Sequence, residues 1–375
     1  MKIVFIQNKG KSFGGVWQVN KTVGEALIKN GYDVTVLSIR ENKTGYDPEY
    51  DSRMHVQTIN PIDIWETYNW SEVIGDLKRF KISSAMKKAR NRIHNNKTMK
   101  QDMKKLQEYL DNLKPDYIVT SHYQVLDLIP RKYLPITFHE QHCSFKESWN
   151  HKGTRKVLIK YKDKVKYIWL CKNSMNAAIE HGLDNSICLY NAVRFETKER
   201  ADVVKNKKLI TIARLSSQKR IDKMISIVEE VFKDKKYKDW KFEIWGDGEE
   251  YDNLKKLIKS PQIKLMGRTN DPKKVLLTSS INLITSDFEG FALSILEANE
   301  CGIPTISYDF GESAPEEVVN DTNGYLVKNR DEFIEKLTML MDDKVRLEKL
   351  SKDSKKFNDN FKINTIVKDW EKTFK

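Results

Sequence analysis

The sequence predicts an α/β protein built from two doubly wound domains in tandem. Short apolar runs, typical of buried parallel strands, alternate with segments of helical periodicity along most of the chain. The 375 residues are more than one ordinary hydrophobic core holds. A charged, aperiodic stretch up to Lys207 interrupts the alternation, which then restarts. We expect a first domain at 1–195, a second at 196–357, and a final helix at 358–375 that packs back towards the first domain.

The first domain opens with a strand, a glycine loop, a helix and a second strand. The strands are expected at 2–6 and 33–39, with the helix at 16–30 between them. This order is typical of a right-handed crossover unit in a parallel sheet. Gly14 and Gly15 open the helix, so they allow either the close approach of a ligand to the backbone or a tight turn needed only for packing.

An insertion and two helices come next. Residues 40–70 are polar and aromatic with little periodicity, as in insertions that carry substrate contacts. The first helix is amphipathic and basic, and it either lies on an anionic membrane surface or covers a packed apolar stripe with solvated lysines. Its apolar face is marked by Ile82, Met86, Ala89 and Ile93, and after a break at Asn95-Asn96 the second helix is marked by Met99, Met103, Leu106 and Leu110.

Two histidines follow short strands of the first domain. Strands at 116–120 and 136–138 precede His122 and His139. Residues just beyond the carboxyl ends of parallel strands line the ligand crevice, so we favour a sugar or phosphate contact for His139 over a structural role. A metal site is disfavoured, because no third and fourth ligands are indicated nearby.

The second domain repeats the alternation. Its strands are expected at 208–213, 241–245, 263–266, 280–284, 305–308 and 324–327, and its helices at 222–232, from the 246–248 loop to 259, and at 272–277, 336–357 and 363–374.

The stretch from Ser286 to Pro304 carries the strongest chemical signal. A strand feeds a helix through Gly290, which places Glu289 in the loop and Glu297 one to two turns into the helix. Free backbone N–H groups at the start of this helix would favour an anion such as a diphosphate. Taken alone, Glu289 and Glu297 could equally be two charged residues on a solvent-exposed surface with no role in binding.

The loop after the first strand of the second domain holds two cations, Arg214 and Lys219. At a strand's carboxyl end they would face the same crevice as the Glu289 loop. A planar guanidinium and a mobile ammonium suit a diphosphate. Alone, they would be two surface cations of a lysine-rich chain.

Composition restricts the partners and the location. The net charge of +13 points to an anionic partner, and the basic clusters at 78–105 and 152–166 lie in the first half of the chain. No apolar run is long enough to span a bilayer, and the first residues lack a signal-peptide pattern. Scattered cysteines indicate reduced thiols. We expect a cytoplasmic protein, peripheral on the inner face of the membrane if it binds lipid.

Taken together, these features resemble the retaining nucleotide-sugar glycosyltransferases of family 4, over nearly the whole chain. That family has the GT-B fold, in which two Rossmann-like domains face a deep cleft. The matching elements are the Gly14-Gly15 loop, His139, Asn191, the Arg214 and Lys219 pair, the Gly246-Asp247-Gly248 loop, Glu289 and Glu297 within EGFALSILEANECGIP, and the segment 323–327.

The resemblance implies a role for each matching residue. Arg214 and Lys219 would hold the diphosphate, and Glu289 would contact hydroxyls of the donor sugar, which His139 would approach. Glu297 would take the ribose hydroxyls. The backbone groups of Gly290, Phe291 and Ala292 would complete the diphosphate seat, Gly14 and Gly15 would close over the phosphates, and the base would lie near Gly246 and Arg268.

The resemblance also implies the reaction. A UDP-sugar would donate a hexosyl unit with retention, by front-side displacement, to a glycan, a lipid-linked saccharide or a teichoic-acid-like polymer. No cofactor or metal is expected, because the sequence has no D-x-D signature and Asp287-Phe288-Glu289 is the nearest approach to one.

Two other functions and one ambiguity remain open. A UDP-N-acetylglucosamine 2-epimerase has the same fold but lacks the Glu289 and Glu297 signature. A nucleic-acid-binding protein would fit the net charge, yet no nucleic-acid motif supports it, so no nucleic-acid partner is expected. The segment 308–317 departs from the family pattern, which leaves open whether Glu316 or Glu317 matches the family's glutamate.

Overall fold

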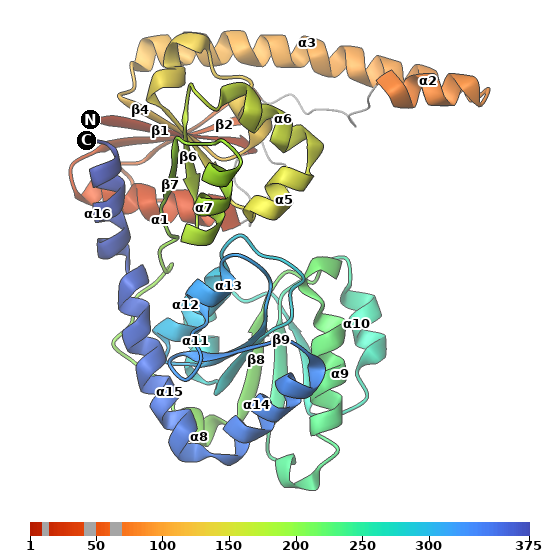
Figure 1. The fold of residues 1–375 in the computed structure, drawn as a ribbon, viewed down its shortest axis with the longest axis vertical. Helices are drawn as coiled ribbons and strands as arrows, with labels where there is room; N and C mark the ends of the chain where they lie inside the picture. The colour runs from red at the N-terminus through yellow and green to blue at the C-terminus, as the bar shows by residue number, and fades with distance from the viewer. Residues whose placement is uncertain (10–14, 41–49, 61–69) are drawn as a thin grey trace. The chain divides into compact units, whose positions relative to one another are not determined.

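The computed structural model describes residues 1–9, 15–40, 50–60 and 70–375, drawn in Figure 1. It divides into two compact α/β units, as the sequence predicts. The first unit comprises Met1–Glu140, His151–Ile168 and Gly182–Ser186, and the second comprises Gln141–Asn150, Trp169–His181 and Ile187–Lys375.

The first sheet has seven strands among the described residues, in the order β3-β2-β1-β4-β5-β6-β7. Its central strand β1 pairs in parallel with both β2 and β4. The strands are β1 Lys2–Lys9, β2 Asp33–Arg40, β3 His55–Asn60, β4 Tyr117–Thr120, β5 Thr137–Gln141, β6 Lys166–Trp169 and β7 Ser186–Cys188. The helices are α1 Gly15–Lys29, α2 Trp70–Lys78, α3 Ile82–Leu113, α4 Tyr123–Leu126, α5 Phe145–Asn150, α6 Lys152–Tyr161 and α7 Lys172–Glu180, with a 3-10 turn at Arg131–Ile136.

The second sheet has six strands among the described residues, in the order β10-β9-β8-β11-β12-β13. The strands are β8 Lys208–Ile212, β9 Lys241–Trp245, β10 Ile263–Gly267, β11 Ile281–Ile284, β12 Thr305–Tyr308 and β13 Gly324–Val327. The helices are α8 Val203–Asn206, α9 Ile221–Val231, α10 Tyr251–Leu257, α11 Pro272–Leu277, α12 Leu293–Glu300, α13 Ala314–Glu317, α14 Arg330–Asp342, α15 Lys344–Phe357 and α16 Ile363–Thr373, with 3-10 turns at Ser217–Lys219, Lys235–Tyr237 and Asn358–Phe361.

The strand order reverses direction once in each sheet. In the second sheet the reversal lies between β8 and β11, which are parallel neighbours although distant in sequence. In open parallel sheets, ligands bind beyond the carboxyl ends of the strands at such a point. The loops that follow β8 and β11 are therefore the first place to look for a site.

The insertion expected at 40–70 contains a strand, so that prediction was partly wrong. Residues His55–Asn60 form β3, which extends the first sheet by pairing in parallel with β2. Only Asn60 of β3 is buried, since the strand lies at the sheet edge, and apart from Val56 and Ile59 its residues are polar. An edge strand without an apolar alternation does not stand out in a sequence.

The two helices expected after the insertion are one continuous helix, α3, which buries Leu106 and Leu110 as expected but exposes most of the expected apolar face of its first half. Ile82, Met86 and Ile93 are each more than 60% exposed. The buried residues of α3 include a polar series, Asn91, Asn95, Thr98 and Asp102. The prediction of a packed apolar stripe on this helix was therefore wrong for these three residues.

A buried polar network attaches α3 to the sheet. The Arg40 guanidinium at the end of β2 forms an ion pair with Asp102, and Asn60 Nδ2 at the end of β3 donates to Asp102 Oδ1 at 2.7 Å. All three residues are at most 2% exposed. Because buried charges need partners, this network fixes the register of α3 against the two strands.

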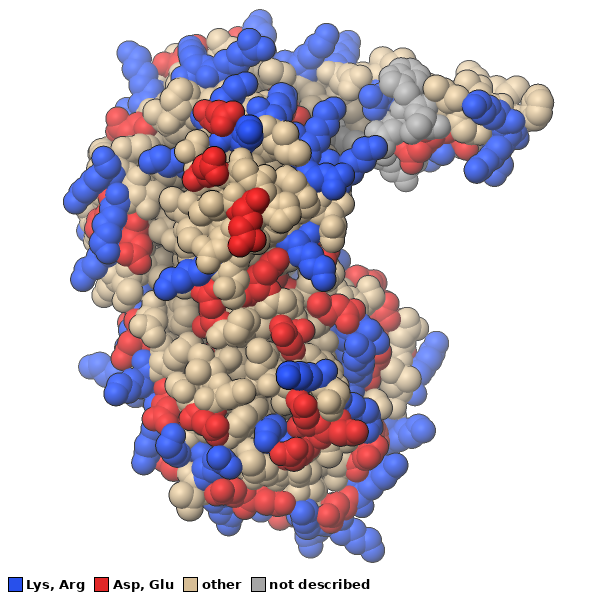
Figure 2. Space-filling model, in the orientation of Figure 1, with Lys and Arg blue, Asp and Glu red and all other residues tan. Residues whose placement is uncertain are grey.

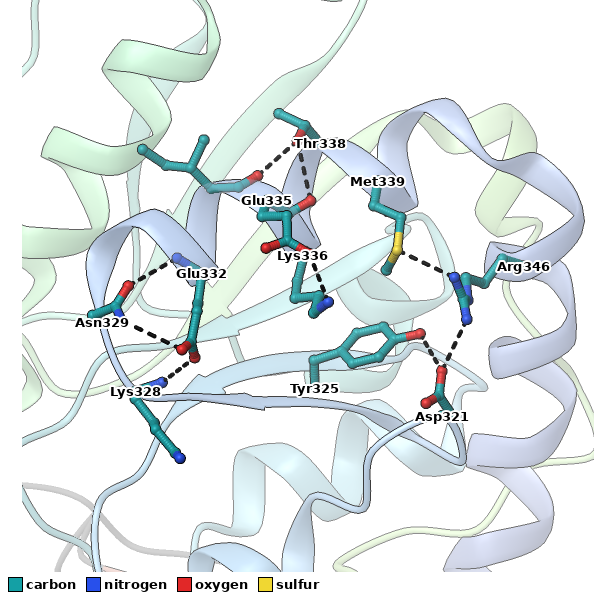
Figure 3. A network of polar contacts seen from close by, with 11 residues as sticks. Asp321, Tyr325, Lys328, Asn329, Glu332, Glu335, Lys336, Thr338, Met339 and Arg346 are labelled. Carbon is teal, nitrogen blue, oxygen red and sulfur yellow. Dashed lines mark hydrogen bonds and ion pairs between the residues drawn. The ribbon is translucent and has the colours of Figure 1, made fainter.

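The helix expected at 336–357 is two helices, and Figure 3 shows the contacts at the start of the first. Asn329 Oδ1 accepts from the Glu332 amide at 2.9 Å, and Glu332 Oε2 accepts from the Lys328 amide at 2.8 Å, which together cap α14. Asp343 ends α14 and caps α15 by accepting from the Arg346 amide at 2.9 Å.

Within the described part of the chain, no helix combines the length and the apolar content that crossing a bilayer requires.

Candidate functional site

The two loops at the reversal point of the second sheet are joined to each other. One follows β8 and the other follows β11. Gln218 Nε2 donates to the Phe288 carbonyl oxygen at 2.6 Å, and the Asp287 amide donates to the Gln218 carbonyl oxygen at 2.9 Å. Thr285 Oγ1 donates to the Arg220 carbonyl oxygen at 2.9 Å. These bonds hold the loops as one rigid edge.

This edge brings Lys219 against Glu289. Lys219 Nζ donates to Glu289 Oε1, and Ser286 Oγ donates to the same oxygen at 2.6 Å. The two side chains are 22% and 11% exposed, so water screens the ion pair less than it would at the surface. The ammonium is thus held in a fixed position, from which it can meet an anionic ligand.

Glu297 lies in the middle of α12 and is bound to a cation that the sequence did not single out. Its carboxylate forms an ion pair with Arg194 Nε and is 1% exposed, whereas the Arg194 side chain is 30% exposed. Arg194 sits in the charged stretch between the two sheets, where one more basic residue gives no signal. Each of the two glutamates of the signature therefore has its own cation.

The start of α12 is closely packed. A Cβ atom on Gly290 would lie 1.9 Å from the His142 carbonyl oxygen, so only glycine fits here. The Phe291 ring is buried and lies 5.7 Å from the Tyr190 ring and 5.6 Å from the Phe361 ring, between centroids. The Ala292 amide donates to Glu317 Oε2 at 2.7 Å. A carboxyl oxygen thus already lies at the N-terminus of α12.

Glu317 is a third buried carboxyl of this site. It has no exposed surface, and its Oε1 atom finds no hydrogen-bond partner among the described residues. Burial raises the pKa of Glu317 to about 8, the nearby Glu289 carboxylate adds to the rise, and Lys219 opposes it. The group can therefore be protonated near neutral pH.

Glu316 points elsewhere, which separates the two adjacent glutamates. Its carboxylate accepts from the amides of Lys172 at 3.2 Å and Asn173 at 3.0 Å, and from the Tyr190 hydroxyl at 2.6 Å. It therefore occupies the N-terminus of α7. Glu317 is the member of the pair that lies at the α12 end.

Two other expected residues of the second unit lie outside this contact network. The Arg214 side chain is 74% exposed and forms an ion pair with Glu249 at 3.3 Å, whereas Lys219 pairs with Glu289. Gly246 has a φ of +142°, and a Cβ there would lie 1.8 Å from the Ala213 carbonyl oxygen. Glycine at position 246 therefore allows the loop after β9 to pass close to the loop that carries Ala213.

The remaining predicted residues belong to the start of the chain and to the first unit. Gly14 lies outside the described residues, and Gly15 is the exposed first residue of α1. His139 lies within β5 rather than beyond it, because the strand extends to Gln141. Its buried ring makes a 2.7 Å contact from Nδ1 to Thr120 Oγ1 on the neighbouring strand.

Among the described residues, no group of three or more His, Cys, Asp or Glu side chains is arranged to hold a metal ion. Asp287, the first acid of the Asp287-Phe288-Glu289 segment, pairs instead with Arg220 at 3.4 Å and Lys223 at 3.5 Å.

Comparison with solved structures defines the class of fold. An S. aureus TarM mutant in complex with fondaparinux, alpha-GlcNAc-glycerol and UDP matches 100% of both chains, with a TM-score of 0.77 at 16% sequence identity. The two-domain architecture is the GT-B fold of glycosyltransferases. The predicted fold class is confirmed.

Comparison of sequences identifies a family domain in the second half of the chain. The model of the family "Glycosyl transferases group 1" matches residues 193–357. An uncharacterized glycosyltransferase of Haemophilus influenzae is 27% identical over 98% of each chain. A poly(ribitol-phosphate) alpha-N-acetylglucosaminyltransferase of Staphylococcus aureus is 24% identical over 62% of this chain and 48% of its own, so the chain spans about half of that relative. Residues 193–357 are therefore a glycosyltransferase group 1 domain, as the motifs predict.

Proposed function

We propose that this glycosyltransferase transfers a hexosyl unit from a UDP-sugar, with retention of configuration, to a hydroxyl group of a cell-surface glycan, a lipid-linked saccharide or a teichoic-acid-like polymer. The observation that carries the proposal is the Lys219–Glu289 pair at the reversal point of a sheet whose residues match group 1 glycosyltransferases. The UDP in the TarM complex and the name of the S. aureus relative support the choice of donor and acceptor.

In this proposal Lys219 changes its partner when the donor binds. In the absence of a donor its ammonium is held by Glu289. A diphosphate with more negative charge draws the ammonium away, and Glu289 is released to accept hydrogen bonds from hydroxyls of the donor sugar. Arg214 has a long and exposed side chain, so it can fold over the outer phosphate. Charges fixed before the reaction stabilise the departing diphosphate best.

The amides at the start of α12 complete the diphosphate seat. The amides of Gly290, Phe291 and Ala292 face the anion together. The Ala292 amide, which donates to Glu317 when no donor is bound, then donates to a phosphate oxygen instead. Glu297 accepts from the ribose hydroxyls and is oriented by Arg194. In this proposal His139 contacts the reacting sugar, and Gly14 and Gly15 contact the phosphates.

The reaction needs no protein nucleophile. The bond between the anomeric carbon and the diphosphate oxygen breaks, and the acceptor oxygen bonds to the same face of that carbon. The acceptor's proton passes to the departing phosphate oxygen, and the leaving group is UDP. Lys219 and Arg214 neutralise this oxygen, so the proposal includes neither a metal nor another cofactor.

The basic first half of the chain suits an anionic or membrane-borne acceptor, and we place the enzyme in the cytoplasm at the inner face of the cell membrane. The test is UDP release. UDP-glucose and UDP-N-acetylglucosamine are each incubated with poly(ribitol phosphate) or poly(glycerol phosphate), and the anomeric configuration of the product is read by NMR. An inverted product, or UDP release that does not depend on the acceptor, would refute the proposal.

A further inference from the structure

The hairpin of α2 and α3 carries large apolar side chains on its outside. They gather at one end, residues 74–86, which we call the hairpin tip. In Figure 1 this end projects beyond the sheet of its own unit. Single exposed apolar residues are ordinary, but a cluster of them marks an interaction surface. The exposed fractions are 49% for Ile74, 51% for Leu77, 89% for Phe80, 61% for Ile82 and 67% for Met86.

The inside of the hairpin tip is held together by polar contacts. Asp76 is 8% exposed, and its Oδ2 atom accepts from Ser84 Oγ at 2.6 Å and pairs with Lys88 Nζ at 2.8 Å. Besides the buried Val73 and Ala85, polar groups thus join the two helices, while the large apolar side chains of the tip face outward. A hairpin that only faced water would have the opposite arrangement.

Phe80 occupies a backbone position where glycine is usual. The Lys81 amide donates to the Asp76 carbonyl oxygen at 2.9 Å, and the Phe80 amide donates to the Leu77 carbonyl oxygen at 3.0 Å, which is the Schellman pattern of a helix end. Phe80 has the left-handed φ of 56° that this pattern requires. A bulky side chain is rarely found there, because its Cβ is strained. The turn itself therefore gives no reason for a phenylalanine.

Cations surround these apolar side chains. Lys78, Arg79 and Lys81 are exposed on either side of Phe80. Residues 78–92 contain seven Lys or Arg and no acidic residue. In Figure 2 the far end of the hairpin shows blue Lys and Arg side chains among tan residues that are not charged. Apolar side chains mixed with cations are typical of segments that lie in the interface of an anionic membrane.

We propose that the hairpin tip docks on an anionic lipid bilayer. Phe80, Leu77 and Ile82 enter the boundary between headgroups and acyl chains, while Lys78, Arg79 and Lys81 bind lipid phosphates. Long basic side chains can do both, since their stems cover apolar surface and their charged ends stay in water. This docking assigns the membrane contact to one surface, and it does not depend on the identity of the donor or acceptor.

Phe80→Gly separates docking from folding. Glycine suits the left-handed position, so the melting temperature of the variant is expected to equal or exceed that of the wild type. Binding to phosphatidylglycerol vesicles, measured by sedimentation, is expected to weaken about tenfold because the aromatic anchor is lost. The triple change of Lys78, Arg79 and Lys81 to Gln is expected to weaken it roughly 100-fold, since each cation near the surface contributes about fivefold.

The matched control is the change of Lys100, Lys104 and Lys105 to Gln. It removes the same charge from α3, roughly 30 Å along the helix from the hairpin tip and beyond the screening length at physiological salt, so binding stays near the wild-type value. The proposal is overturned if the wild type does not sediment with anionic vesicles even at low salt, or if the control weakens binding as much as the tip variant. It is also overturned if, without lipid, the chain forms a dimer that Phe80→Gly dissociates.

Discussion

Glu317→Gln tests the electrostatics of the site through the stability of the fold. Burial raises the pKa of Glu317 from its ordinary value of 4.5 to about 8 in the folded chain. A carboxyl with a raised pKa favours the folded state at low pH, and this contribution is lost as the pH rises towards the folded pKa. Between pH 6 and pH 8 the unfolded chain has already released this proton, while the folded chain still holds most of it.

The size of the effect follows from the two pKa values. One pKa unit corresponds to 1.36 kcal/mol, so the wild type is expected to lose about 2 kcal/mol of unfolding free energy through Glu317 between pH 6 and pH 8. A glutamine keeps an oxygen for the Ala292 amide and does not ionise. The stability of the variant relative to the wild type should therefore rise by about 2 kcal/mol over this interval.

The assay is urea unfolding followed by tryptophan fluorescence at pH 6, 7 and 8. Comparing the variant with the wild type at each pH cancels the other titrating groups. Glu316→Gln is the matched control, since it removes the neighbouring carboxylate and leaves the buried one. If the wild type and Glu317→Gln change in parallel with pH, Glu317 does not hold a proton and the reasoning is wrong.

Three further predictions concern the donor, the metal and the buried network. Glu297→Ala should weaken donor binding by about 1.5–3 kcal/mol, measured by titration calorimetry. Glu289→Ala should lower turnover, measured from initial rates, by a similar free energy and more than it lowers donor affinity. Unchanged values for both variants would exclude the assigned roles. EDTA should leave the transfer rate largely unchanged, and a loss that magnesium or manganese restores would count against a metal-free reaction. Asp102→Ala should lower the unfolding free energy by about 3–5 kcal/mol in urea, because it leaves the buried Arg40 without its carboxylate; a loss below 1 kcal/mol would show that the network is dispensable.

The parallel strands were predictable because they are buried. The strand at 324–327 and the helix at 272–277 have the bounds that the sequence predicts, since apolar runs and a proline at a helix start are local signals. β3 is mostly polar and lies at the sheet edge, so it has no such signal. The orientation of α3 depends on Arg40, which is 62 residues away from its partner Asp102, and hydrophobic periodicity alone cannot include such a contact.

The site was predictable to the extent that topology determines it. Parallel strands end at one edge, so the loops carrying Lys219 and Glu289 were expected to face one crevice, and in the structure the two side chains touch. The pairing of Glu297 with Arg194 depends on the path of the stretch between the two sheets, which follows no pattern. Glu316 and Glu317 are adjacent, and only the helical phase of α13 decides which of them is buried.

The most direct test of the central claim is the affinity of UDP for the wild type, Lys219→Ala and Lys223→Ala, measured by titration calorimetry. Lys223 is the control, since it lies four residues further on, its side chain is 40% exposed, and Asp287 is its acidic partner. We expect UDP to bind the wild type, Lys219→Ala to bind it at least tenfold more weakly, and Lys223→Ala to bind it within about twofold of the wild type, because a charge-assisted contact in a shielded site contributes about 1.5–3 kcal/mol. Equal UDP affinity in all three proteins, or no binding of UDP to the wild type, would contradict the assignment of Lys219 and Glu289 to the donor site.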